Sequence, residues 1–143
     1  DYDKCFLECK DICIKTTFTG LLEKEDLYEL YQIADIGVVP SLFEPFGYVA
    51  VEMMMHQLPV VVTATSGLNE IVDNTCGLKI PLTVLPDSVE IDSKLLSEKI
   101  LYLIEHPTEA KQMRENGRGR FLNKYSSKIF CENMLWIYKS ICT

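Results

Sequence analysis

Two glutamates stand out because they interrupt an otherwise apolar stretch, SLFEPFGYVAVEMMMHQLPVVV, at residues 41–62. Glu44 lies in its loop-like first part. Glu52 falls about one and a half turns into a predicted helix over residues 48–57 that is apolar nearly all round. A buried carboxylate costs several kcal/mol unless it is paired or hydrogen-bonded. Glu52 therefore needs hydroxyl donors, and the two vicinal hydroxyls of a ribose would supply them.

The loop PSLFEPFG follows a predicted strand and ends at Gly47, where the next helix begins. In open parallel sheets, ligands bind beyond the carboxyl ends of the strands. The start of a helix leaves backbone N–H groups unpaired, and Gly47 lets a phosphate or a sugar hydroxyl approach them closely. Glu44 would lie at the lip of this loop. The plainer alternatives stay open, namely a solvated loop residue at Glu44 and a carboxylate at Glu52 that reaches water.

The elements around this loop alternate between strand and helix. Strands are predicted at 11–18, 35–40, 59–63 and 77–81, and helices at 23–34, 48–57 and 67–72. Parallel pairing follows, because each parallel crossover requires a helix packed on the sheet. We therefore expect an α/β fold with a Rossmann-like parallel sheet and flanking helices. Four short strands are few for such a sheet, which suggests a fragment of a larger fold.

The second half of the chain has a different pattern. Residues 81–92, PLTVLPDSVEID, contain two prolines and are predicted to form a loop. Helices are expected at 93–105, 108–123 and 127–142, wrapped around the sheet. We treat residues 1–143 as one domain, with the strand and helix alternation and the site in 1–81 and the loop and C-terminal helices in 82–143.

Composition excludes several classes of protein. The formal net charge of −7 disfavours nucleic acid as a partner. No run reaches about 18 apolar residues, so no membrane span is indicated, and the charged start lacks the pattern of a secretory signal. A cytoplasmic location is expected. The six cysteines follow no compact secreted spacing and are interpreted as free thiols.

Residues 12–81 resemble the C-terminal, nucleotide-sugar-binding domain of the retaining glycosyltransferases of family 4 (group 1), which have the GT-B architecture of two facing Rossmann-like domains. The segment that carries the resemblance is FTG…LYELYQIADIGVVPSLFEPFGYVAVEMMMHQLPVVVTATSGLNEIVD…CGLKIP. Its most specific part is a Glu, seven residues, Glu pattern, with Pro-Ser before it, Pro-Phe-Gly inside it and a Pro-Val-Val strand after it.

The resemblance implies a role for each matching residue. Glu44 would be the catalytic residue, a glutamate placed at the donor sugar near the reacting face. Glu52 would bind the ribose hydroxyls. Phe46, Gly47 and Tyr48 would match the segment whose backbone amides meet the sugar and its phosphate. Thr19, Gly20 and Leu21 would match the loop that touches the nucleobase. The implied chemistry is a hexosyltransferase-type transfer of a sugar from a nucleotide diphosphate with retained configuration, with no cofactor and no essential metal.

The chain also departs from the family pattern. Gln57 stands where the family usually has a glycine, and Ser66 replaces the first of a common Gly-Gly pair. The basic pair that neutralises the donor pyrophosphate would lie upstream of residue 12, where nothing supplies it. An N-terminal acceptor domain is a further implied partner. We therefore expect the chain alone to bind weakly and to be inactive.

Alternatives remain for the function and for individual residues. A non-catalytic nucleotide-binding or interaction module is the main rival, and a response-regulator-like domain is weaker because its acidic cluster is missing. Glu52 and His56 have metal-ligand spacing, but a third ligand is hard to name, so no metal is predicted. The basic run from Lys111 to Lys128 is interpreted as a solvated face, with docking to another domain or peripheral association with anionic membranes as the alternatives.

Overall fold

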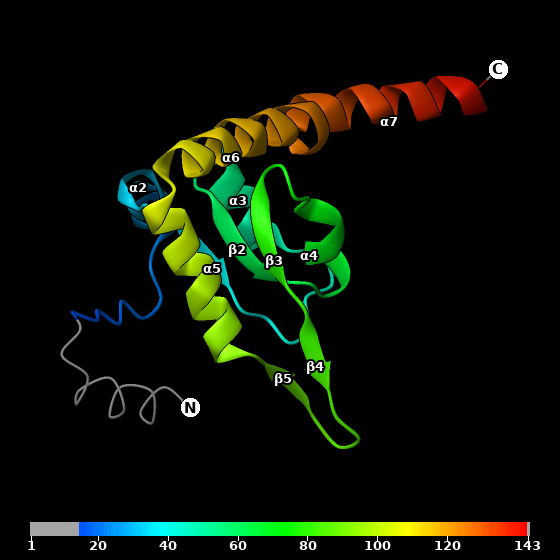
Figure 1. The fold of residues 1–143 in the computed structure, drawn as a ribbon. Coiled ribbons are helices and arrows are strands. Elements are labelled where there is room, and N and C mark those ends of the chain that lie inside the picture. The colour runs from blue at the N-terminus through cyan, green and yellow to red at the C-terminus, as the bar shows by residue number, and fades with distance from the viewer. Residues whose placement is uncertain (1–14, 143) are drawn as a thin grey trace.

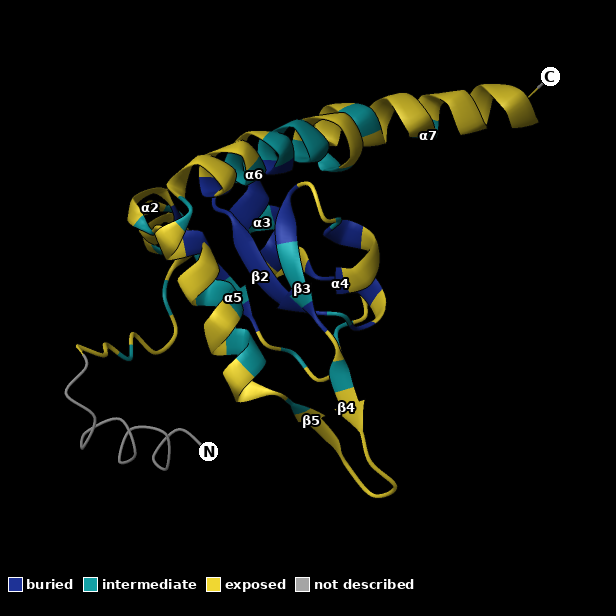
Figure 2. Ribbon diagram, in the orientation of Figure 1, coloured by how far each residue is buried: buried dark blue, intermediate teal, exposed yellow. Residues whose placement is uncertain are grey.

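Three short parallel strands form the centre of the structure, a computed structural model that describes residues 15–142. Strands β1 (Gly37–Val39), β2 (Val60–Thr63) and β3 (Gly77–Ile80) lie in the order β1-β2-β3. Gly37 is paired with Val60, and Thr63 with Ile80. All of β2 is buried, as Figure 2 shows in dark blue, because it is the middle strand and both of its faces are covered.

Helices cover the two faces of this sheet and make a three-layered arrangement (Figure 1). On one face lie α2 (Lys24–Ile33), α3 (Tyr48–Met55) and α4 (Ser66–Ile71), which share a core with the side chains of alternate β2 residues. On the other face lie α5 (Ser93–Glu105) and the start of α6 (Pro107–Arg120), whose Leu103 and Ala110 pack with Val61. The expected α/β fold with a parallel sheet and flanking helices is confirmed.

Helix α6 continues past the amino-terminal edge of the sheet and joins the two faces. Its Gly117 lies against Met54 and Cys76, and the following π-helix η1 (Phe121–Tyr125) packs on the core beneath α3. An alanine at 117 would add a β-carbon 3.3 Å from Cγ of Met54, so this crossing depends on a small residue.

Three arginines of α6 bind the C-terminal ends of three different helices. Arg114 donates to the carbonyl oxygen of Asp35, just beyond α2, at 2.9 Å. Arg118 donates to the last carbonyl of α3, that of Met55. Guanidinium groups are favoured there because the last carbonyls of a helix lack partners and carry partial negative charge.

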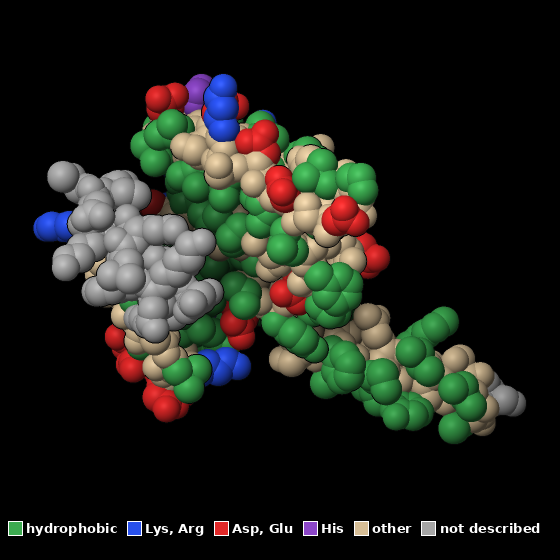
Figure 3. Space-filling model, turned by 90° about the horizontal axis from the view of Figure 1, so that it is seen from below, with side chains coloured by type: hydrophobic (Ala, Val, Ile, Leu, Met, Phe, Trp, Pro, Cys, Tyr) green, Lys and Arg blue, Asp and Glu red, His purple; other side chains and the backbone are tan. Residues whose placement is uncertain are grey.

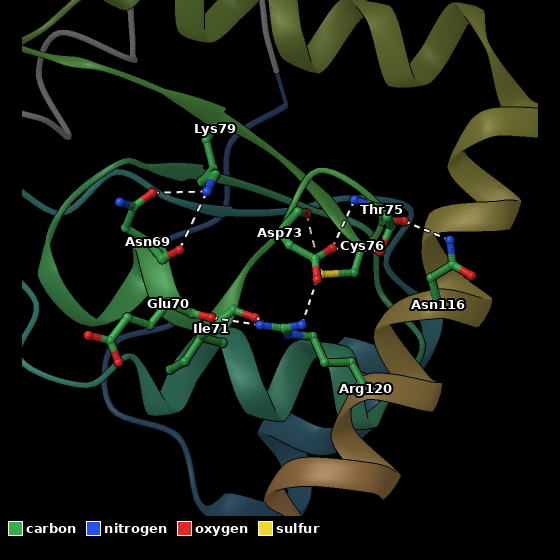
Figure 4. A network of polar contacts seen from close by, with 9 residues as sticks. All are labelled: Asn69, Glu70, Ile71, Asp73, Thr75, Cys76, Lys79, Asn116 and Arg120. Atoms are coloured by element: carbon green, nitrogen blue, oxygen red, sulfur yellow. Dashed lines mark hydrogen bonds and ion pairs between the residues drawn. The ribbon is translucent and has the colours of Figure 1, made fainter.

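The third of these arginines, Arg120, forms the densest network, drawn in Figure 4. It donates to the carbonyl oxygens of Ile71 at 2.6 Å and Glu70 at 2.7 Å, at the end of α4, and pairs with the carboxylate of Asp73 at 2.5 Å. Asp73 also accepts from the N–H and the hydroxyl of Thr75. The three arginines of the basic run are thus engaged with backbone carbonyls at or just beyond helix ends, and the expectation of a solvated face was wrong for them, whereas Lys111, Lys124 and Lys128 are exposed.

The predicted helices agree with the structure within a few residues, whereas two predicted segments do not. Residues 15–18, the described part of the strand expected at 11–18, form no strand. The segment predicted as a loop contains the antiparallel hairpin β4 (Leu82–Val84) and β5 (Val89–Ile91). Its two prolines flank β4 or lie in the turn, where a missing N–H removes no ladder hydrogen bond.

The last helix, α7 (Ser127–Ile141), projects away from the sheet and has no buried residue (Figures 1 and 2). Its apolar stripe was expected to pack on the sheet, and that expectation was wrong. Phe130 remains 65% exposed and Ile141 74% exposed. The spacing of apolar residues therefore indicated the helix correctly but not what covers it.

Candidate functional site

The candidate site lies at the carboxyl-terminal edge of the sheet, where the loop of residues 40–47 follows β1. Hydrogen bonds from the segment that joins β2 to α4 hold this loop in place. Thr63 Oγ1 donates to the carbonyl oxygen of Ser41 at 2.5 Å, and Thr65 Oγ1 donates to that of Leu42 at 3.4 Å. The N–H of Gly67 donates to the carbonyl oxygen of Glu44 at 3.0 Å. These bonds come from buried residues between the end of β2 and the start of α4, so they hold the shape of the loop after β1.

Figure 3 views the molecule from the side toward which the strands run. Apolar side chains gather over the middle of this face and along α7, with acidic side chains scattered among them. The loop contributes Phe43, which is 72% exposed, and Leu42, which is 51% exposed. A contiguous apolar patch on the surface can mark a binding site.

Two glycines allow the loops to approach each other. Gly47 has φ +105°, a left-handed conformation, and lies at the start of α3. Gly67 lies at the start of α4, and a β-carbon there would overlap the backbone of Phe46. Ser66, in contrast, is exposed. Only the second residue of the family's usual Gly-Gly pair is therefore required by packing, which explains how this chain accepts a serine at the first.

Glu44 is half-buried and folds back over its own loop. Its Oε1 accepts a hydrogen bond from the N–H of Gly47 at 3.1 Å. The carboxylate therefore lies at the N-terminus of α3, where the partial positive charge of the helix end favours an anion. The interpretation of Glu44 as a plain solvated loop residue does not hold, because its side chain has a defined partner in the site.

Phe46 and Tyr48 lie on either side of Gly47, and their ring centroids are 4.6 Å apart. Tyr48 is 71% exposed, so its ring is available to a ligand. The Phe46 ring also meets Tyr125 of η1 edge-on at 6.3 Å. The structure thus brings together Glu44, Phe46, Gly47 and Tyr48 in one short segment at the start of α3.

Glu52 points toward the neighbouring helix α2. Its side chain is 26% exposed, and Oε1 accepts a hydrogen bond from the hydroxyl of Tyr28 at 3.3 Å and lies 4.0 Å from Lys24 Nζ. Glu52 was expected to be buried on most sides, and the partly buried carboxylate agrees with that expectation. Its protein partners, Tyr28 and Lys24, were not predicted, because their contact with Glu52 depends on how α2 packs against α3.

Aromatic rings surround this carboxylate. The rings of Tyr28 and His56 lie 4.6 Å apart, and those of Tyr31 and His56 lie 5.9 Å apart. Burial, followed by the negative charge of Glu52, raises the pKa of the Tyr31 hydroxyl. The Nε2 atom of His56 is buried and has no partner among the described residues. The side chains around Glu52 are therefore fixed mainly by ring packing.

Within the described residues, the loop predicted to contact a nucleobase makes no hydrogen bond or ion pair with the other predicted site residues. Thr19, Gly20 and Leu21 are all exposed, Leu21 completely so. Thr19 Oγ1 donates only to the carbonyl oxygen of Gly20, whose φ of +66° is left-handed. No hydrogen bond or ion pair joins these residues to Glu44 or Glu52 in the described part of the chain, so their predicted role stays a prediction.

Other candidate sites can be stated briefly. Within residues 15–142, no group of three or more His, Cys, Asp or Glu side chains lies where it could hold a metal ion. The Asp-x-Asp of residues 1–3 and the cysteines before residue 15 lie outside the described residues, whereas Cys76, Cys131 and Cys142 are free thiols, as predicted. None of the described helices is long and apolar enough to cross a membrane.

A concavity of about 820 Å³ lies elsewhere, between β1 and the helices α5 and α6. Its lining includes Ile36, Val38 and Ile100, and none of the predicted site residues. It is formed where the outer edge of β1 is not covered by another described strand. Its lining includes the start of α6 at Pro107 but has one carboxylate only, that of Asp35, so we place the candidate site at the carboxyl edge instead.

Comparisons with known proteins show the family of the chain and its fold. Residues 4–120 match the family model described as glycosyl transferases group 1. An alpha-D-kanosaminyltransferase from Streptomyces kanamyceticus is 26% identical over 128 residues, which cover 89% of this chain and 31% of that protein. The chain spans less than a third of the length of the curated relatives it matches.

Two solved structures have the same fold over most of the chain. A sucrose-phosphate synthase from Thermosynechococcus elongatus superposes with a TM-score of 0.80 at 28% identity, over 97% of this chain and 33% of that one. The C-terminal domain of a group 1 glycosyl transferase from Francisella tularensis superposes with a TM-score of 0.70 at 26% identity, over 88% of this chain and 64% of that domain.

Proposed function

Because the chain belongs to the glycosyl transferases of group 1, as the family match over residues 4–120 shows, we propose that it forms the donor-binding half of a retaining glycosyltransferase. The donor would be a nucleotide diphosphate sugar. The observation that carries the proposal is the pair of carboxylates at the carboxyl edge of the sheet, one at the start of α3 and one partly exposed farther along it.

The two carboxylates have different environments, and this supports different roles. Glu44 lies at the helix start, beside the N–H groups that would meet the phosphate and the departing nucleotide diphosphate. It would orient the transferred sugar so that its anomeric carbon faces the acceptor. Glu52 has a side chain that is 26% exposed, and its carboxylate would accept hydrogen bonds from the ribose hydroxyls and fix the nucleotide. Catalysis would then depend mainly on positioning and electrostatics, without an essential metal.

The rest of the enzyme enters as part of the proposal. A second domain would bring the acceptor to the carboxyl edge and supply the basic pair for the pyrophosphate. The reaction would take place in the cytoplasm, and peripheral association with a membrane would act through the exposed lysines of the basic run, since its arginines are engaged internally. The alternative function is a module that binds nucleotide without turnover, in which case the same site would bind ligand but the full-length protein would be inactive.

Thermal-shift measurements test the donor site. The full-length gene product is heated with millimolar UDP, GDP or ADP, and with their sugars. A ligand at about 100 times its dissociation constant should add about 2.7 kcal/mol of stability. We expect one nucleotide to raise the melting temperature, and Glu52→Ala to abolish the shift. Glu98→Ala, an exposed glutamate of α5 on the opposite face of the sheet, is the matched control.

The outcomes separate the two functions. A shift that survives Glu52→Ala would contradict the ribose role, and the absence of any shift would contradict a nucleotide site. A nucleotide-dependent shift together with release of nucleotide from the sugar donor, lost in Glu44→Gln, supports the transferase. A shift without turnover under any acceptor tested supports the binding module.

A further inference from the structure

Among the described residues, Tyr28 is the one whose side chain donates a hydrogen bond to the carboxylate of Glu52. Its hydroxyl donates to Oε1 over 3.3 Å, from α2 to α3, across 24 positions of the chain. No described residue donates to Oε2 of the same carboxylate. One oxygen of Glu52 is therefore held by the protein, and the other remains for a ligand, on a side chain that is 26% exposed.

The position of the Tyr28 hydroxyl is set by packing on several sides. Its ring lies 4.6 Å from the ring of His56 and 6.3 Å from that of Tyr31. Lys24 Nζ lies over the ring as well, 5.3 Å from its centroid. Because these neighbours confine the ring, the hydroxyl cannot move far from Glu52 without disturbing the contact between α2 and α3.

Lys24 does not replace Tyr28 as the partner of the carboxylate. Its Nζ lies 4.0 Å from Oε1, and its side chain is 66% exposed. An exposed lysine at that distance contributes a weak, screened attraction and does not fix the orientation of a carboxylate. A tyrosine hydroxyl, in contrast, offers a single directional donor.

We propose that Tyr28 is a positioning residue of the ribose site: it holds one oxygen of Glu52 so that the carboxylate presents the other to a ribose hydroxyl. This inference rests on the proposed function, because it assumes that Glu52 binds the ribose. It assigns a role to a residue of α2 for which the sequence resemblance implies none. Because an ionised carboxylate has two accepting oxygens, Glu52 can bind Tyr28 through one and a ligand through the other without rotating.

The test compares affinities for nucleotides with and without ribose hydroxyls. The full-length gene product is titrated with UDP, GDP and ADP, and then with the 2′,3′-dideoxy form of the one that binds. Tyr28→Phe keeps the ring and removes only the donor. Tyr31→Phe makes the same chemical change three residues away on α2, at a hydroxyl that makes no hydrogen bond to Glu52, and is the matched control.

We expect Tyr28→Phe to weaken binding of the ribonucleotide by about five- to tenfold, as the loss of one hydrogen bond of ordinary strength would. Binding of the dideoxynucleotide should hardly change, so the discrimination between the two shrinks. Tyr31→Phe should keep the wild-type ratio. In a Glu52→Gln background, adding Tyr28→Phe should have little further effect, because both changes impair the same hydrogen bond between residue 52 and the ribose.

The outcomes also separate this inference from the proposed function. If Tyr28→Phe keeps the wild-type ratio while Glu52→Gln loses it, the inference is overturned and the ribose role of Glu52 stands. If Tyr28→Phe weakens both nucleotides equally and lowers the melting temperature, Tyr28 has only a structural role, which also overturns it. If the wild type does not discriminate between the two nucleotides, or binds none of the three diphosphates, the proposed function fails and the inference fails with it.

Discussion

The N–H of Gly67 donates a hydrogen bond to the carbonyl oxygen of Glu44 at 3.0 Å, which joins the start of α4 to the loop that carries the candidate catalytic carboxylate. The approach is so close that a β-carbon on Gly67 would overlap the backbone of Phe46. The geometry of the site therefore depends on a residue that has no side chain to contribute.

Gly67→Ala should destabilise the protein by about 2–3 kcal/mol, because the new methyl group meets backbone atoms that cannot move aside easily. This loss should exceed the gain of up to about 1 kcal/mol that alanine gives in a helix. Urea denaturation measures the difference. Ser66→Ala, at the exposed neighbouring position, should stay within about 0.5 kcal/mol of the wild type. Equal stability of the two variants would show that the loop can shift.

Gln57→Gly should stabilise the protein by about 0.5–1 kcal/mol, because glycine adopts a left-handed conformation without the clash of a β-carbon. Gln57 follows α3 with φ +59°, and the bonds from Gln57 N to Met54 O (3.1 Å) and from Leu58 N to Met53 O (2.9 Å) form a Schellman motif around it. Part of the gain is lost to the greater freedom of glycine in the unfolded chain.

Gln57→Ala is the control for that variant, since alanine keeps the β-carbon and the strain. Its stability in thermal denaturation should match that of the wild type within about 0.5 kcal/mol. If the glycine variant is no more stable than the alanine variant, backbone strain at residue 57 is not the reason why the family usually has a glycine at this position.

Asp73→Asn should cost about 1 kcal/mol at neutral pH, since the aspartate carboxylate is partly exposed and its pairing with Arg120 is screened by solvent. Hydrogen bonds from Thr75, with a further contribution from Arg120, lower the pKa of this carboxyl below its usual value. A lowered pKa contributes stability above the unfolded pKa of about 3.9, and the contribution is lost as pH falls through the lower folded value. The difference between variant and wild type should therefore disappear in acid.

The measurement is the free energy of unfolding of both proteins from pH 7 down to pH 2. Asp87→Asn, at the exposed tip of the β4–β5 hairpin, serves as the control and should change stability little at neutral pH. A cost of Asp73→Asn that stays constant through pH 3 would rule out a charge-dependent role for the network around Arg120.

Cys76 should resist alkylation in the native protein, whereas Cys131 and Cys142 should react quickly. Cys76 is fully buried, and burial raises the pKa of its thiol, so little of the reactive thiolate is present. Treatment with iodoacetamide followed by peptide mass spectrometry gives the extent of reaction at each site. The same treatment in urea should modify all three. Fast native modification of Cys76 would mean that α6 separates readily from the sheet.

Much of the fold could be predicted from local pattern. The alternation of buried strands with short helices between residues 23 and 81 was sufficient, because each of those elements is a short apolar or amphipathic run bounded by turn residues. The β4–β5 hairpin was missed because each strand has only three residues, too few to show an alternation, and because its prolines indicated a loop. The unpacked position of α7 was also missed, because an apolar stripe predicts a buried face without naming its partner.

By itself, the sequence determined the α/β class, the two carboxylates on the loop and helix after β1, and the glycine that lets that helix begin there, since these depend on neighbours a few residues away. The tertiary structure decided which groups those carboxylates meet. Tyr28 reaches Glu52 across 24 residues, and Arg120 reaches the end of α4 across 49. Such contacts depend on how one helix is rotated and placed against another. The packing of the whole core determines that orientation, so a pattern among residues near in sequence cannot predict it.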